Sequence, residues 1–337
     1  MTTGTPEVQN DMNRRFGLQR RRLLAAAALA AVSLRRVASA AGIELPATYA
    51  TLDFDWVDAA RQRPVPVRLY LPDAAAAAKP VPLAVFSHGI GGSRYGYSYL
   101  GQHWAAHGIA SLHLQHVGSD RNLWFGNPLG LVGRLADAAR DGEAIARAQD
   151  LRFALDRLLM GDLARRIDAA RIAAAGHSYG ANTTLLAVGA RVEREGRVID
   201  LRDERLRAAI VISSPPFYGE AQPQTVLAAV KVPSLHVTAT EDVIRIPGYW
   251  SGAEDRVAVF DAIGGPRKLL AVFNGGSHSV FTDRAGTGGA LLNPQVKAAT
   301  RELSLAFLRQ ELQGDSGEIG GWGERHRDIV ARFVRVG

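Results

Sequence analysis

Cysteine is absent from this 337-residue sequence. Without a thiol the chain can form no disulfide, no thiolate metal site and no cysteine nucleophile. Long apolar runs are scarce as well, because no window reaches the ~18 consecutive apolar residues of a membrane span. We therefore expect no stable membrane insertion. The fold must depend on a packed core, for which the apolar content of 47% is ordinary.

A large excess of charge is also absent from most of the chain. The formal net charge is +7, but residues 1–40 hold seven arginines against two acidic residues. The residues that follow carry 33 basic and 31 acidic side chains, which leaves them close to neutral. A near-neutral body gives no electrostatic reason to bind nucleic acid or an anionic membrane, so we expect neither partner.

Residues 1–40 have the composition of an export signal. Residues 20–22 are three arginines that resemble a twin-arginine pattern, and a short apolar run covers residues 23–34. Residues 38–40 are Ala-Ser-Ala, a small-residue cleavage site. We expect the mature protein to begin near Ala41 and to be periplasmic or secreted. A disordered basic arm is the alternative.

Strand-like and helix-like segments alternate along residues 41–337. The patterning predicts strands at 51–56, 65–71, 82–87, 109–115, 171–175, 208–213, 234–240 and 268–273, and helices at 97–107, 137–160, 181–190 and 293–312. Such alternation is typical of an α/β fold with a mostly parallel central sheet covered by helices on both faces. No repeat or linker divides the chain, so we expect a single domain and a monomer. Its longer excursions fall near 117–135, 191–207, 214–230 and 241–267.

The segment Gly176-His-Ser-Tyr-Gly180 has the context of a nucleophile elbow. A small-residue strand at 171–175 precedes it, and a helix pattern at 181–190 follows it. The serine of such an elbow sits on a turn tight enough to lift its hydroxyl above the sheet. Ser178 is therefore the candidate nucleophile, and the N-terminal end of the next helix would face a developing oxyanion. A glycine-flanked turn without chemistry is the alternative.

A serine on such an elbow needs an acid and a base that follow it in the order Asp or Glu, then His. Three histidines follow Ser178. Only His278 lies on a glycine-rich loop just past a predicted strand, so we assign it as the general base. The other two lie in an apolar strand and in the polar C-terminal tail.

The acid should end the strand before that histidine. The strand at 234–240 is followed by Glu241 and Asp242, and we choose Asp242 as the group that fixes the imidazole tautomer. Glu241 is the alternative. Asp255 and Asp261 lie further along the same loop and remain open as well.

The turn after the strand at 82–87 has the sequence His88-Gly-Ile-Gly-Gly92, which lets the backbone approach a substrate closely. We expect the backbone amides of Ile90 and Tyr179 to form the oxyanion hole. A glycine cluster can also bind phosphate, but this one lacks the Lys-Ser/Thr of a P-loop and the spacing of a dinucleotide fingerprint. We therefore predict no cofactor.

Other residue patterns bear on metal and substrate. His103 and His107 lie one helical turn apart, but no carboxylate lies at a ligand spacing, so no metal site is predicted. Aromatic residues gather in the excursions at strand ends, where this arrangement builds its pocket. The candidates for substrate binding are Trp124, Phe125, Phe217, Tyr218, Tyr249 and Trp250. Together they favour apolar acyl or alcohol groups, although each alone could instead cover the edge of the core.

The segments Phe86–Gly91 and Gly176–Gly180, with Asp242 and His278, resemble bacterial relatives of the platelet-activating factor acetylhydrolases, chains also described as dienelactone hydrolase-like. The resemblance spans roughly residues 50–310 and implies an α/β-hydrolase fold. It also implies a serine ester hydrolase that works through a Ser-His-Asp triad and an acyl-enzyme intermediate, on small-molecule or lipid-like carboxylic esters. A polyester-degrading, cutinase-like hydrolase and a non-catalytic binding protein on the same scaffold are the alternatives.

Overall fold

The computed structural model describes residues 48–337, except residues 74–78, 221, 247, 288 and 316. The predicted export signal at residues 1–40 lies outside the described residues. From residue 48 onward the described chain belongs to one compact unit. None of the described helices combines the length and the apolar character that crossing a membrane requires.

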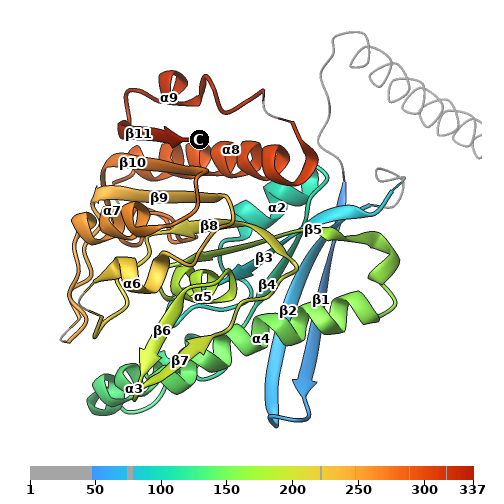
Figure 1. Ribbon diagram of the computed structural model, residues 1–337, viewed down its shortest axis with the longest axis vertical. Helices are drawn as coiled ribbons and strands as arrows, with labels where there is room; N and C mark the ends of the chain where they lie inside the picture. The colour runs from blue at the N-terminus through green and yellow to red at the C-terminus, as the bar shows by residue number, and fades with distance from the viewer. Residues whose placement is uncertain (1–47, 74–78, 221, 247, 288, 316) are drawn as a thin grey trace, which may run out of the picture. The chain divides into compact units, whose positions relative to one another are not determined.

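A nine-stranded sheet forms the centre of the described chain (Figure 1). In spatial order its strands are β1 (Tyr49–Asp58), β2 (Arg63–Pro72), β4 (Ala110–Leu114), β3 (Val81–Ser87), β5 (Ile167–His177), β8 (Leu206–Ile212), β9 (Ser234–Glu241), β10 (Lys268–Ser277) and β11 (Val330–Val336). The strands from β4 to β10 in this order are parallel. The pairs β1–β2, β2–β4 and β10–β11 are antiparallel. The predicted mostly parallel sheet is therefore confirmed.

Helices cover both faces of this sheet (Figure 1). One face carries α2 (Ser98–Ala106) and α8 (Leu292–Gln313), and the other carries α4 (Asp141–Met160), α5 (Tyr179–Ala187), α6 (Pro223–Leu227) and α7 (Ala253–Ala262). Each face has its own apolar core, with Trp104 buried in the first and Leu151 in the second. Ala173, Ala174 and Ala175 of β5 alternate between the two cores, because successive side chains of a strand point to opposite faces.

Short elements fill the excursions between the strands. They are η1 (Arg121–Trp124), η2 (Pro128–Gly130), α3 (Leu131–Ala138), η3 (Ala164–Arg166), α9 (Trp322–Arg325) and the antiparallel hairpin of β6 (Arg191–Arg194) with β7 (Arg197–Asp200). The hairpin occupies the segment that the sequence predicts only as a charged, exposed excursion. Its first strand begins four residues after α5 ends, so it lies next to the nucleophile helix in the sequence.

Two expectations about the C-terminal third are wrong. Residues 241–267 are not a continuous loop, because α7 forms within them. This helix begins where Asp255 Oδ2 accepts the backbone N–H of Gly252 at 2.8 Å, and it buries Phe260. The strand at 268–273 is not the last one either, since β11 pairs with it after the chain has turned at the buried Trp322.

Candidate active site

Ser178 lies on the turn between β5 and α5. Its backbone angles are φ 56° and ψ −125°, a conformation that residues with a side chain rarely adopt. A Cβ at Gly176 would overlap the carbonyl oxygen of Gly180, and a Cβ at Gly180 would overlap that of Ser87. Only glycine fits at these two positions. The motif glycines therefore permit the close approach of strand, turn and helix that places the Ser178 side chain at a cavity.

His278 lies between Ser178 and Asp242. The distance from His278 Nε2 to Ser178 Oγ is 2.8 Å, and the distance from His278 Nδ1 to Asp242 Oδ1 is 2.7 Å. An ionised Asp242 accepts the Nδ1–H of the ring, which leaves Nε2 to accept the hydroxyl proton of Ser178. The structure thus brings together the three side chains that chain order had selected.

Asp242 is fully buried, and it accepts a second hydrogen bond from Thr238 Oγ1 at 2.8 Å. Arg256 Nη2 lies 3.5 Å from Asp242 Oδ1. Burial opposes ionisation of this carboxyl group, but the hydrogen bond and charge of His278 and the charge of Arg256 outweigh it. The pKa of Asp242 is therefore held well below its usual value. Glu241 is exposed at the end of β9, so Asp242 is the carboxylate in contact with the imidazole.

His177, the residue before the nucleophile, also contacts the site, although sequence analysis did not single it out. Its Nδ1 accepts the Tyr97 hydroxyl at 2.7 Å, and its Nε2 donates to the His278 carbonyl oxygen at 3.0 Å. Burial lowers the pKa of His177 to about 3, so the ring is neutral and carries a single proton. It therefore ties the loop of His278 to the elbow. The Gly-x-Ser-x-Gly pattern leaves this position unspecified and gives no signal for the contact.

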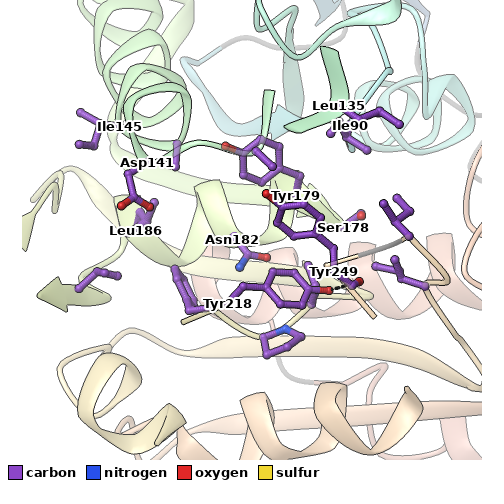
Figure 2. A pocket seen from close by; sticks show the side chains of 18 of the residues that line it. Ile90, Leu135, Asp141, Ile145, Ser178, Tyr179, Asn182, Leu186, Tyr218 and Tyr249 are labelled. Atoms are coloured by element: carbon purple, nitrogen blue, oxygen red, sulfur yellow. Dashed lines mark hydrogen bonds between the residues drawn. The ribbon is translucent and has the colours of Figure 1, made fainter. Parts of the chain in front are cut away.

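The loop after β3 brings Ile90 close to Ser178. A Cβ at Gly89 would lie 3.2 Å from Ser178 Cβ, which shows how closely the loop backbone approaches the nucleophile. Ile90 and Tyr179 both line the cavity that contains Ser178 (Figure 2). Neither of their backbone N–H groups has an acceptor among the described residues. Two such amides beside the nucleophile have the chemistry that stabilises an oxyanion.

An apolar cavity extends from Ser178 toward the N-terminal end of α4 (Figure 2). Its apolar wall consists of Ile90, Leu135, Ala139, Ala144, Ile145, Leu186, Val192, Ile199, Pro215, Pro216, Phe217, Ile244 and Ile246. Polar groups are few along it: Asn182, three tyrosines, and Arg194, whose Nε donates to Asp141 at 2.8 Å. The same guanidinium also contacts Glu220. Both charged side chains of the wall, Asp141 and Arg194, are therefore paired, and the cavity favours an uncharged, apolar group.

The aromatic residues predicted to bind substrate divide into two groups. Phe217, Tyr218 and Tyr249 line the cavity, whereas Trp124, Phe125 and Trp250 do not. Trp124 instead covers the loop after β3 and donates its Nε1–H to a backbone carbonyl there at 2.8 Å. Phe125 and Trp250 point to solvent, with 64% and 61% of their surface exposed. Their position in the excursions identified the region of the pocket but not the direction of each side chain.

Metal ligands do not gather in the described part of the chain. It contains no group of three or more histidine, cysteine or acidic side chains that could hold an ion. His103 and His107 form a pair on α2, with ring centroids 4.3 Å apart.

Comparison with known proteins gives a match to a family model and matches to solved structures. Residues 70–121, which include β3, β4 and the loop of Ile90, match the family model described as platelet-activating factor acetylhydrolase, isoform II. The structure is similar to that of a ferulic acid esterase from Streptomyces cinnamoneus, with a TM-score of 0.62 and 23% identity over 86% of this chain and 98% of that chain. No curated protein matches the sequence. The resemblance to the acetylhydrolases is thereby confirmed over residues 70–121, and the chain has the α/β-hydrolase fold.

Proposed function

We propose that the protein is a carboxylic ester hydrolase that acts on small-molecule or lipid-like esters with an apolar acyl group. The observation that carries this proposal is the hydrogen-bonded series Ser178–His278–Asp242, which opens into an apolar cavity. The matching family model, described as an acetylhydrolase, and the similar structure, an esterase, support the same class of reaction.

In the proposed reaction, Ser178 Oγ attacks the ester carbonyl carbon while His278 Nε2 takes the hydroxyl proton. The amides of Ile90 and Tyr179 donate to the oxyanion of the tetrahedral intermediate. As the intermediate collapses, His278 gives the proton to the leaving alkoxide oxygen, and an acyl-serine remains. Water that loses a proton to the same histidine then attacks the acyl-serine and releases the acid. Asp242 stays ionised and stabilises the imidazolium.

A fluorophosphonate probe tests the nucleophile, because it forms a covalent adduct with an activated serine. We expect one adduct on Ser178 in the folded protein and none in Ser178→Ala. His278→Ala should slow hydrolysis of nitrophenyl esters by about 10⁴-fold without loss of the circular dichroism of the fold. A folded wild-type protein that gains no adduct would favour a non-catalytic binding protein on this scaffold.

The substrate class is tested by a series of nitrophenyl esters of increasing acyl length, run beside a feruloyl ester and a phospholipid with a short second acyl chain. The apolar wall of the cavity supports a preference for apolar acyl groups. Preference for the phospholipid would support acetylhydrolase activity. Activity confined to simple esters would indicate a general carboxylesterase, and equal rates for charged and apolar acyl groups would contradict the proposed specificity.

A further inference from the structure

A second serine–histidine–aspartate array lies behind the loop that carries Ile90. Ser87 Oγ is 3.0 Å from His116 Nε2, and His116 Nδ1 is 3.1 Å from Asp150 Oδ2. All three side chains are fully buried, and none of them lines the cavity of Ser178. The array therefore has no access to substrate. Its contacts act on the neighbouring backbone instead.

The protons of this array are fixed by its partners. Burial, together with the charges of nearby arginines, lowers the pKa of His116 well below its usual value, so the ring is neutral. Its Nδ1 then donates to Asp150, and its Nε2 accepts from Ser87. The backbone N–H of His116 donates to His88 Nε2 at 3.1 Å. The hydrogen bonds of Ser87, His116 and Asp150 thus hold His88, the first residue of the loop that carries Ile90. Such a hydrogen-bonded cluster favours a single conformation of the loop.

The loop at residues 88–92 is held from its other side as well. The Gly91 N–H donates to the Ser119 carbonyl oxygen at 2.8 Å, and the Gly91 carbonyl oxygen accepts Trp124 Nε1–H at 2.8 Å. Within the described chain the Ile90 N–H lacks such a partner. The backbone around Ile90 is therefore anchored, while its own amide remains available to a ligand in the cavity.

Arg147, one turn before Asp150 on α4, contacts both sides of this arrangement. Its Nη2 donates to the His88 carbonyl oxygen in the loop, and its Nε donates to Thr183 Oγ1 on α5 at 2.8 Å. Its guanidinium carbon lies 4.5 Å from the centroid of the Tyr179 ring. The side chain is fully buried. A single guanidinium thus joins the loop of Ile90 to the helix that begins at Tyr179.

We propose that Arg147 is a positioning residue that fixes the spacing of the two oxyanion donors, the amides of Ile90 and Tyr179. The inference rests on the proposed function, since these amides are donors only if the protein performs acyl transfer. A planar guanidinium can donate in several directions of one plane at once, which a lysine ammonium on a flexible stem does not reproduce. Burial lowers the pKa of Arg147 to about 10, so it remains a cation at neutral pH and its hydrogen bonds are charge-assisted.

Loss of this spacing should affect the transition state rather than the bound substrate. An oxyanion donor contributes about 10²–10³-fold to kcat, because its hydrogen bond strengthens as charge develops on the carbonyl oxygen. Binding in the apolar cavity does not depend on that bond. We therefore expect Arg147→Met to lower kcat by about 10²-fold or more, with KM changed less than about threefold. Arg147→Lys keeps the positive charge but lacks the planar set of N–H donors, and it should lower kcat by about tenfold.

The experiment compares wild type, Arg147→Met, Arg147→Lys and the control Arg152→Met. Arg152 lies on the same helix with its side chain 48% exposed. Rates on a nitrophenyl ester are divided by the number of sites that a fluorophosphonate labels at completion, so misfolded protein does not contribute. A trifluoromethyl ketone, whose adduct with the serine carries an oxyanion, reports on the oxyanion hole. We expect its Ki to rise by the factor by which kcat falls, and both values to be unchanged in Arg152→Met.

If Arg147→Met has the same kcat per labelled site and the same Ki as wild type, Arg147 has no positioning role. If that variant does not fold, Thr183→Val removes one anchor of the guanidinium and should lower kcat by about tenfold with a matching rise in Ki. Unchanged values in Thr183→Val would then overturn it. A folded wild-type protein that neither hydrolyses esters nor reacts with the probe would refute the proposed function itself, and the positioning role with it.

Discussion

Asp242 and Glu241 are adjacent residues in opposite environments at the end of β9. Asp242 is buried and contacts His278, whereas Glu241 is exposed. We expect Asp242→Asn to lower kcat/KM by about 10⁴-fold, because the amide cannot stabilise the imidazolium and favours the wrong tautomer. Glu241→Gln should stay within about twofold of wild type, as exposed substitutions usually do. Hydrolysis of a nitrophenyl ester compares them, and a larger loss in Glu241→Gln would move the acid role to that residue.

Individual site residues can be predicted from the sequence where a local pattern or the order of residues along the chain identifies them. Ser178 follows from a strand–turn–helix context, and His278 from its place on a glycine-rich loop after a strand. The sequence also favours Asp242 but leaves Glu241 open, and the burial of Asp242 and exposure of Glu241 distinguish the two in the structure. The contacts of His177 and Arg147 could not be predicted, since they join segments far apart in the chain through backbone carbonyl groups.

The β6–β7 hairpin forms one wall of the cavity. Val192 and Ile199 face each other across it and both line the cavity, whereas Val198 is 63% exposed. Ile199→Trp should fill the part of the cavity beside the hairpin, and lower kcat/KM for an octanoyl ester by about tenfold relative to an acetyl ester. Val198→Trp is the matched control and should leave that ratio unchanged. Equal ratios in both variants would show that long acyl groups do not reach the hairpin.

Strands with continuous apolar character were predictable, whereas three strands rich in arginine, β6, β7 and β11, were not. All residues of β3 are buried, and its apolar run marks it clearly as a central strand. The hairpin at 191–200 has arginines at 191, 194 and 197 and glutamates at 193 and 195, which indicated an exposed segment and concealed the inward face of Val192. Similarly, β11 has arginines at 332 and 335 among its apolar residues, and its pairing depends on the return of the tail through Trp322.

Across the whole molecule, burial lowers the pKa values of several histidines. They are His88, His113, His116, His177 and His236, with pKa values of about 4 for His113 and about 3 for His177 and His236. The unfolded chain takes up these protons near pH 6.5, whereas the folded chain does not, so stability present above that pH is lost as the pH falls. Each such histidine contributes up to about 1.4 kcal/mol per pH unit to the slope.

We therefore expect the Tm to fall steeply between pH 6 and pH 4, as measured by scanning calorimetry. His236→Gln lies outside the triad and keeps a hydrogen-bonding side chain. The slope of unfolding free energy against pH should fall by the amount that corresponds to the uptake of about one proton on unfolding. A slope equal to that of wild type would mean that His236 is protonated in the folded protein.

The N-terminal residues 1–40 differ in charge from the rest of the chain. We propose that residues 1–40 direct twin-arginine export, since they hold seven arginines while the rest of the sequence is nearly neutral. Replacement of Arg20, Arg21 and Arg22 by lysine should leave the precursor in the cytoplasm. Fractionation of the native host measures where the protein is found. N-terminal sequencing of wild type should begin near Ala41. A cytoplasmic enzyme that retains residues 1–40 would contradict the proposal.

The position of α4 has a consequence for how new substrate preferences could evolve. Its first two turns carry Asp141 and Ile145, which line the cavity, and also Arg147, which contacts both sides of the proposed oxyanion hole. A mutation that displaces α4 to admit a bulkier acyl group would therefore broaden the range of substrates but lower kcat. The hairpin is joined to α4 by the partly exposed ion pair of Arg194 with Asp141, whereas the contacts of Arg147 are buried. Selection for broader specificity should accumulate changes in the hairpin before it accumulates them in the helix.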